Sequence, residues 1–288
     1  MNAKSKNAIF VAIIANLSIT IGKFIVALIT GSSAVLAETL HSLGDSVNQI
    51  MLYIGYKRSK RRRTKMHPMG YGRERYFYAL IISLSIFSLG GVFALQQGLR
   101  TLRNPHPVEH LGLAITLLLF SAVFEGISFT AAIKAAKSQR GVGGWWAYIK
   151  NSKAPEIPLL LLEDLGALLG IVIALLGLIL TKLTTNALFD SIASLLIGVL
   201  LIVVALLLFL EFKSLLIGEA ASKEIYEKIE SFLKSEGYQG FKFKTLQTGP
   251  DEVIVIISLP DFDKKKLIKL KRSLRKLDKE IAEVFFDV

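Results

Sequence analysis

The sequence lacks cysteine altogether and holds only four histidines in 288 residues. The missing cysteines exclude a disulfide scaffold, a thiolate zinc finger, an iron–sulfur centre and a cysteine nucleophile. Acidic residues are also scarce over positions 1–210, where nine of them stand against 20 basic residues. From Glu211 to Val288 the two kinds are nearly balanced, at 14 acidic and 15 basic. The chain therefore consists of two parts of different composition.

The first part contains six apolar stretches that are long enough to cross a bilayer, which takes about 20 helical residues. They cover positions 8–30, 34–56, 76–99, 111–133, 158–181 and 187–210. A soluble helical bundle does not fit, because a run such as 191–210 offers no polar face. A β-barrel does not fit either, because short alternating strands are missing. We expect an all-α six-helix transmembrane domain over residues 1–212.

The basic residues indicate the orientation of these helices, since loops on the cytoplasmic side are rich in Lys and Arg. The link after the second stretch has seven basic residues in the nine positions 57–65, and the link after the fourth is also basic. Both termini are therefore expected in the cytoplasm. The basic run could instead bind nucleic acid or anionic lipid. We favour the orientation signal beside a lipid bilayer, and we expect no nucleic-acid partner.

Residues 213–288 have the pattern of a small soluble α+β domain in the order α-β-β-α-β. Ser222 is placed to cap a helix that ends near Gly237. Strands are expected over 241–248 and 253–259, joined by a hairpin turn, and over 283–288. Between them lies a helix with Leu267, Leu270, Leu274, Leu277 and Ile281 on one face. This part has no histidine and no nucleophile constellation, so it is expected to serve packing or dimerisation.

Six of the nine acidic residues before position 211 fall inside the apolar stretches, where a charge costs roughly 2.5–3.5 kcal/mol at a helix centre. These six are Glu38, Asp45, Glu125, Glu163, Asp164 and Asp190. Such residues are candidates for function. Glu125 and Asp190 could instead pair with Lys23 of the first stretch or line a water cavity.

The second stretch carries the richest polar pattern. Glu38, His41, Asp45 and Asn48 are spaced three, four and three residues apart, so they share one helix face. An imidazole and a carboxylate four residues apart can both reach one cation, and this donor pair suits Zn²⁺ better than Mg²⁺. The alternative is a buried His–Asp hydrogen bond that only ties this helix to a neighbour. We favour a metal or proton site.

The fifth stretch adds two adjacent carboxylates, Glu163 and Asp164, directly after four leucines. Neighbouring side chains on a helix point about 100° apart, so the two carboxylates cannot both face one metal ion equally well. A site shared by the second and fifth stretches could use His41, Asp45 and Asp164. Its fourth ligand could be Asn48, Glu163 or a water molecule.

Three segments together carry a resemblance to a known family. They are His41–Asp45 within the second stretch, His67–Glu74 before the third, and Leu215–Ala220 ahead of the soluble part. The chain resembles the cation diffusion facilitator family of proton-coupled divalent metal exporters over nearly its whole length. The resemblance implies a homodimer with a ferredoxin-like or metallochaperone-like cytoplasmic domain.

The resemblance further implies a transport site of one His/Asp-x-x-x-Asp motif on each of helices two and five. His41, Asp45 and Asp164 match these motifs, but Leu160 stands where the family has His or Asp. The departure resembles a branch of the family with Leu-Leu-Glu-Asp in helix five, in which Glu163 would replace the ligand missing at Leu160. Asn48 and Glu38 are further candidate ligands for a metal ion or a proton. The departure also makes Mn²⁺, Fe²⁺, Co²⁺ and Cd²⁺ candidates beside Zn²⁺.

The expected activity is metal/H⁺ antiport, because metal ligands must lose their protons to bind. No nucleotide-binding loop is present in the sequence, and we expect neither an enzyme nor a permanently bound cofactor. One alternative is a non-transporting scaffold or sensor. Another is an intramembrane metalloenzyme that uses Glu38 and His41, which the missing His-Glu-x-x-His pattern disfavours. With no recognisable presequence, the expected location is a prokaryotic plasma membrane.

Overall fold

The computed structural model describes residues 3–138, 140, 144–259 and 264–287. Its chain forms two compact units. The first comprises Met1–Met51, Leu80–Gly141 and Leu159–Phe209, and the second comprises Leu52–Ala79, Val142–Pro158 and Leu210–Val288. The boundary predicted between residues 212 and 213 stays a prediction.

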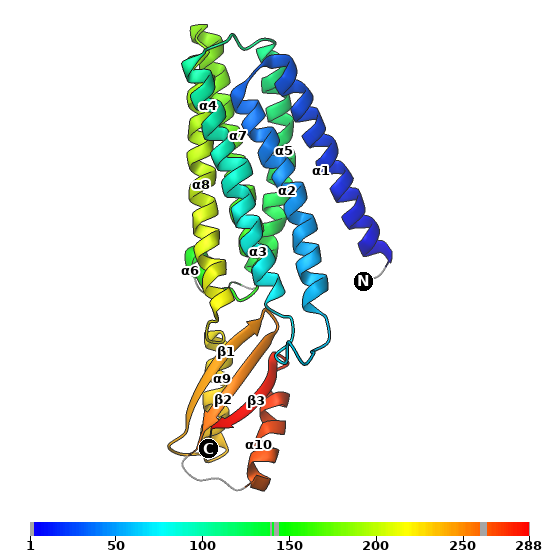
Figure 1. Cartoon of the computed structure of the whole chain (residues 1–288), viewed down its shortest axis with the longest axis vertical. Coiled ribbons are helices and arrows are strands. Elements are labelled where there is room, and N and C mark those ends of the chain that lie inside the picture. Colours follow the sequence, from blue (N-terminus) through cyan, green and yellow to red (C-terminus); the bar gives the residue numbers. More distant parts are fainter. Residues whose placement is uncertain (1–2, 139, 141–143, 260–263, 288) are drawn as a thin grey trace. The chain divides into compact units, whose positions relative to one another are not determined.

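Long helices follow the apolar pattern of the sequence (Figure 1). They are α1 (Ala3–Thr30), α2 (Ser33–Ser59), α3 (Glu74–Ser85) with η1 (Ile86–Val92) and α4 (Phe93–Arg103), α5 (Leu111–Lys137), α7 (Glu156–Thr184) and α8 (Leu188–Ile217). In the described part of the chain, four spans are long and apolar enough to cross a membrane, namely Glu74–Arg103, Leu111–Lys137, Glu156–Thr184 and Leu188–Ile217. The chain is therefore a helical membrane protein. The expected count of six spans stays a prediction, since among the described side chains α1 contributes only the shorter apolar segment Leu17–Thr30 and the polar row of α2 lowers its hydropathy.

The third predicted stretch is not one uniform α-helix. Its middle, Ile86–Val92, is a π-helix, η1, in which the hydrogen bonds span one residue more than in an α-helix. Gly91 in this segment lies against α8, where an added Cβ atom would be 2.5 Å from Cγ1 of Ile202. The hydropathy of the sequence gives no sign of this change, because π- and α-helical turns bury the same residue types.

The second unit contains the expected order of elements, α9 (Lys223–Ser235), β1 (Lys242–Gly249), β2 (Glu252–Ser258), α10 (Lys264–Leu277) and β3 (Ile281–Asp287), and also the short helix α6 (Trp145–Asn151). The strands form one sheet in the order β1-β2-β3, with β1 antiparallel and β3 parallel to β2. Ser222 caps α9 as predicted, because its side chain accepts a hydrogen bond from the Ile225 amide.

One residue of this domain was assigned to the wrong element. Ile281 was predicted on the helix face, but it begins β3 and pairs with Val253 of β2. The helix α10 ends at Leu277, and the turn that follows places the next apolar residue on the sheet. The predicted strand also included Val288, which lies outside the described residues.

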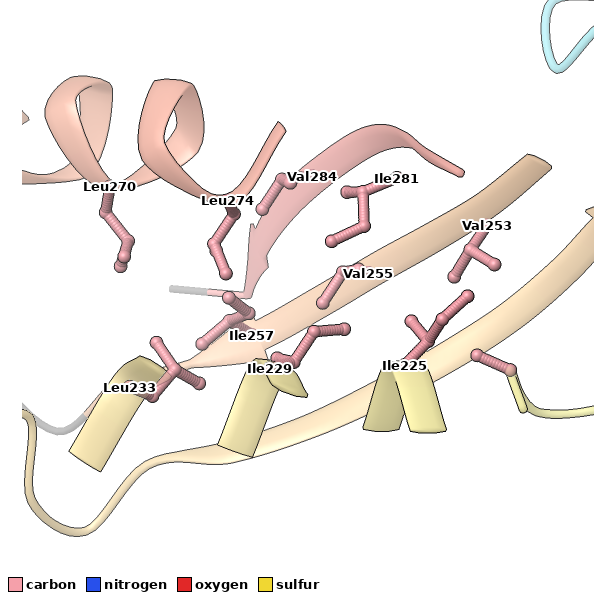
Figure 2. Packing of buried hydrophobic residues seen from close by; sticks show 11 residues of the cluster. Ile225, Ile229, Leu233, Val253, Val255, Ile257, Leu270, Leu274, Ile281 and Val284 are labelled. Carbon is pink, nitrogen blue, oxygen red and sulfur yellow. The ribbon is translucent and has the colours of Figure 1, made fainter. Parts of the chain in front are cut away.

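Buried aliphatic side chains hold the sheet to its two helices (Figure 2). Ile225, Ile229 and Leu233 of α9 meet Val253, Val255 and Ile257 of β2. Leu270 and Leu274 of α10 complete the cluster with Ile281 and Val284 of β3. Full burial of one such side chain stabilises by about 1.5–3 kcal/mol relative to exposure. The buried members of this cluster are aliphatic, and partly buried aromatic side chains such as Phe232 and Phe243 pack against them.

Candidate metal centre on α2 and α7

The polar row of α2 is turned into the protein. Glu38, His41 and Asn48 are buried, and Asp45 is half-buried. Leu43, on the opposite side of the helix from His41, is 41% exposed. The 3.6-residue period of the helix thus separates one polar stripe from an apolar surface. The stripe predicted from the spacing is present as a buried face.

Several polar atoms of this stripe have no partner. Among the described side chains, atoms of all four residues of the stripe are buried without a hydrogen-bond partner: Glu38 Oε1 and Oε2, His41 Nε2, Asp45 Oδ1 and Asn48 Oδ1. His41 Nδ1 lies 3.7 Å from Asp45 Oδ1, which is too long for a hydrogen bond. A buried unsatisfied polar group costs about 1–3 kcal/mol. The alternative interpretation, a buried His–Asp hydrogen bond that only ties α2 to a neighbour, stays open as a role for the pair, although at 3.7 Å the bond itself is not formed.

Glu163 of α7 faces this stripe. The side-chain amide of Asn48 donates a hydrogen bond of 2.6 Å to Glu163 Oε1. Asp45 lies one turn before Asn48 on α2, so its carboxylate is on the side of the helix that meets Glu163. Oxygen and nitrogen donors from two helices, with unsatisfied lone pairs, are suitable ligands for a divalent cation.

Asp164, the neighbouring carboxylate, points elsewhere. It accepts a hydrogen bond of 2.9 Å from Ser128 Oγ of α5. The turn of about 100° between adjacent helical residues explains why Glu163 meets α2 while Asp164 meets α5. Among the described residues, no three His, Asp or Glu side chains are grouped closely enough to hold a metal ion. The set His41, Asp45 and Asp164 therefore stays a prediction.

Asp190, at the start of α8, binds the N-terminal end of α2. Its carboxylate accepts hydrogen bonds from the Ser33 amide at 2.7 Å and from Ser32 Oγ at 2.5 Å. It thus satisfies amides at the N-terminus of α2, where the helix leaves donors unpaired. Lys23 was considered as its partner, but Lys23 instead meets Glu38 and Ser42 of α2. Only the packing of helices, which sequence spacing does not give, could identify these partners.

Comparison with known proteins also identifies a transmembrane domain in this chain. The model of a cation efflux transmembrane domain matches residues 9–217. The mouse protein named proton-coupled zinc antiporter SLC30A9, mitochondrial, is 33% identical over 216 residues, which are 74% of this chain and 38% of that protein. Metal tolerance protein C4 of Arabidopsis thaliana is 31% identical over 234 residues, which are 81% of this chain and 51% of that protein.

A third relative, magnetosome protein MamM of Paramagnetospirillum magneticum, is 31% identical over 87 residues, which are 30% of this chain and 27% of that protein. The chain thus spans about 38% of the mouse relative and half of the plant relative. A cation efflux domain is a transport domain, which agrees with the prediction of a transporter rather than an enzyme.

Proposed function

Because the chain belongs to the cation efflux family, we propose that it moves a divalent metal cation out of the cytoplasm in exchange for protons, with Zn²⁺ as the first candidate. Two observations support the choice of metal. The mouse relative carries zinc and proton coupling in its name. The polar stripe of α2 offers an imidazole nitrogen with carboxylate oxygens, a donor set suited to Zn²⁺.

The observation that carries the proposal is the row of unpartnered atoms on α2 beside Glu163. His41 Nε2, Asp45 Oδ1 and Asn48 Oδ1 are buried without a hydrogen bond among the side chains that the structure describes. Glu163 lies within reach of Asp45 and Asn48. A divalent cation between α2 and α7 would satisfy these groups. In this proposal Glu163 takes the place that Leu160 cannot fill, and Asp164 of α7, which accepts a hydrogen bond from Ser128 of α5, remains a candidate ligand.

Proton coupling follows from the chemistry of the same groups. Two carboxyl groups that share one site, as Asp45 and Glu163 do in this proposal, repel each other when both are ionised. Either a shared proton or a divalent cation removes the repulsion. Loading of metal therefore releases protons, and loading of protons releases metal. Exposure of the site to each side of the membrane in turn gives antiport without a nucleotide.

A second candidate is export of Mn²⁺, Fe²⁺ or Co²⁺ by the same route. One imidazole, one amide and several carboxylates form an oxygen-rich set, which is less selective for Zn²⁺ than a site with two histidines. Leu160 in place of a fourth strong ligand is the observation that favours this choice.

Further parts of the proposal concern assembly and placement. We infer six membrane spans with both termini in the cytoplasm, a transmembrane domain over 1–212, a cytoplasmic domain over 213–288 and a homodimer. A prokaryotic plasma membrane is the proposed location, although the mouse relative is named as mitochondrial.

The test is transport by the purified chain in proteoliposomes that enclose a pH dye. Zn²⁺, Mn²⁺, Fe²⁺, Co²⁺ and Cd²⁺ are added in turn to wild type, to Asp45→Ala and to Glu109→Gln, a control whose side chain is exposed. We expect metal-dependent proton movement in wild type and in the control, and none in Asp45→Ala. If folded wild type moved no proton with any metal, the scaffold or sensor alternative would replace transport.

A further inference from the structure

Lys23 of α1 is a lysine with no access to solvent inside a membrane helix. Its side chain is 0% exposed. Its Nζ donates a hydrogen bond of 2.6 Å to Ser42 Oγ and lies 3.6 Å from Glu38 Oε2. A charged side chain within a membrane is costly, and long basic side chains near helix ends normally extend to the interface. Lys23 instead turns inward to two residues of α2.

Glu38, the partner of Lys23, is held on a third helix as well. An added Cβ atom at Gly170 of α7 would lie within van der Waals overlap of Glu38 Oε1. The carboxylate therefore packs closely on the backbone of α7, and a side chain at position 170 would have to displace the end of the Glu38 side chain. Gly170 follows Glu163 by seven residues, two helical turns, so both belong to the same face of α7. The ion pair thus lies where α1, α2 and α7 meet.

The residues that Lys23 contacts form a ridge next to the candidate metal ligands. Glu38 and Ser42 are four residues apart on α2, as are His41 and Asp45 on the adjacent ridge. A fixed cation therefore stands beside the place proposed for the transported cation.

We propose that Lys23 is a positioning and specificity residue, which pairs with Glu38, keeps it out of the metal-ligand set and places a positive charge beside that set. This inference rests on the proposed transport of a divalent metal. Without Lys23, the site would gain one free carboxylate and lose a repelling charge, so it would bind cations more tightly. The gain would be largest for Mn²⁺, which prefers oxygen ligands.

The ion pair predicts opposite effects for its two members. Lys23→Met removes the repelling charge and frees Glu38, so the affinity for Mn²⁺ rises. Glu38→Gln leaves an unbalanced ammonium group beside the site, so the affinity for both metals falls. The double variant Lys23→Met with Glu38→Gln removes both charges together and brings the affinities back toward those of wild type. Simple structural damage would lower affinity in both single variants.

The experiment is calorimetric titration of the purified full-length chain in detergent with Zn²⁺ and with Mn²⁺. Wild type, Lys23→Met, Glu38→Gln, the double variant and the charge-preserving Lys23→Arg are compared. We expect the Mn²⁺/Zn²⁺ affinity ratio to rise about tenfold or more in Lys23→Met, in the range by which partners of metal ligands change affinity. Lys23→Arg keeps the ratio of wild type.

Two results would overturn the inference. In the first, Lys23→Met lowers the affinity for both metals or leaves the ratio unchanged. In the second, the double variant binds as weakly as Glu38→Gln, which would make Glu38 a direct ligand. If Lys23→Met does not fold, the comparison of Glu38→Gln with the double variant decides alone. If the wild-type protein bound neither metal, the proposed function itself would be contradicted. This result can be told apart from the two results that overturn the inference about Lys23.

Discussion

Asn48 of α2 donates its side-chain amide to Glu163 Oε1 of α7 over 2.6 Å, across 115 positions of the sequence. This bond fixes the amide so that Asn48 Oδ1 is left without a partner among the described residues. The same Glu163 approaches Asp45. One hydrogen bond between two helices thus both positions a carboxylate and leaves an oxygen free for a cation.

Glu163→Gln should separate the structural role of this residue from its role toward metal. The Gln side chain keeps an oxygen that can accept the bond from Asn48, so the fold is expected to persist. The lost negative charge should lower Zn²⁺ affinity by about tenfold or more. Calorimetry on the purified chain measures it, with Glu156→Gln, in the first turn of the same helix, as control. Unchanged affinity and metal preference would mean that Glu163 only joins the helices.

Asp190→Ala should destabilise the start of α2. The carboxylate accepts hydrogen bonds from Ser32, Ser33 and Ala34, and loss of such a cap costs about 0.5–2 kcal/mol. Chemical denaturation in detergent, followed by the fluorescence of the two tryptophans, measures the change. Asp190→Asn, which retains one acceptor oxygen, is expected to lie between wild type and Asp190→Ala. Equal stability of all three proteins would contradict the capping role.

Gly198→Ala should disturb the packing of α8 on α4, whereas Gly22→Ala should not. A Cβ atom at Gly198 would lie 2.8 Å from the backbone nitrogen of Leu95, and one at Gly22 would meet nothing within 4 Å. Overpacking costs about 1–3 kcal/mol, while alanine in place of an unhindered helical glycine stabilises by about 0.8–1 kcal/mol. The two thermal midpoints should therefore move in opposite directions. A rise in both midpoints would show that α8 can shift away from α4 at little cost.

The stability of the β-sheet in the second unit should fall at acidic pH. Lys271 Nζ lies 2.6 Å from Glu283 Oε1, and this hydrogen bond holds the pKa of the Glu283 carboxyl below its usual value. A depressed folded-state pKa stabilises above the unfolded pKa of about 4.3. The contribution is lost as pH falls from there through the folded value.

Hydrogen exchange of the β3 amides in the full-length chain, between about pH 6 and 3.5, measures this loss around the carboxyl pKa. The exchange rates are corrected for their intrinsic dependence on pH. Glu283→Gln is the matched control, since it cannot titrate and its stability should change less over this range. Parallel pH profiles for the two proteins would show that the Glu283 ion pair contributes nothing measurable.

Sequence spacing predicted local relationships well. The steps of three and four between Glu38, His41 and Asp45 placed them on one face, because side chains on one helix are related by fixed geometry. The cap at Ser222 was predicted for the same reason. By contrast, the partners of Lys23 and Asp190 depend on which helix faces meet. Many pairings of apolar faces bury similar area, so the pattern does not choose between them.

The adjacent carboxylates of α7 illustrate the same limit at the candidate site. Their 100° separation predicted that the two could not face one centre on α2 equally well. The spacing did not say which one, and family resemblance favoured Asp164. The structure brings Glu163 to Asn48 and gives Asp164 to Ser128 of α5. The rotation of a helix about its own axis is set by its neighbours, and a single sequence does not record it.

The hydrogen bonds of the Asp190 cap connect the first turn of α8 to the first turn of α2. Ser194 Oγ, one turn further along α8, donates to the Ala94 carbonyl oxygen of α4, so α8 is fastened on two sides. A displacement of α8 must either break these bonds together or carry α2 and α4 with it. The polar row of α2 begins at Glu38, five residues after Ser33, which bonds to Asp190. Any motion that opens the proposed site must therefore either keep the start of α2 attached to α8 or break the hydrogen bonds of Asp190.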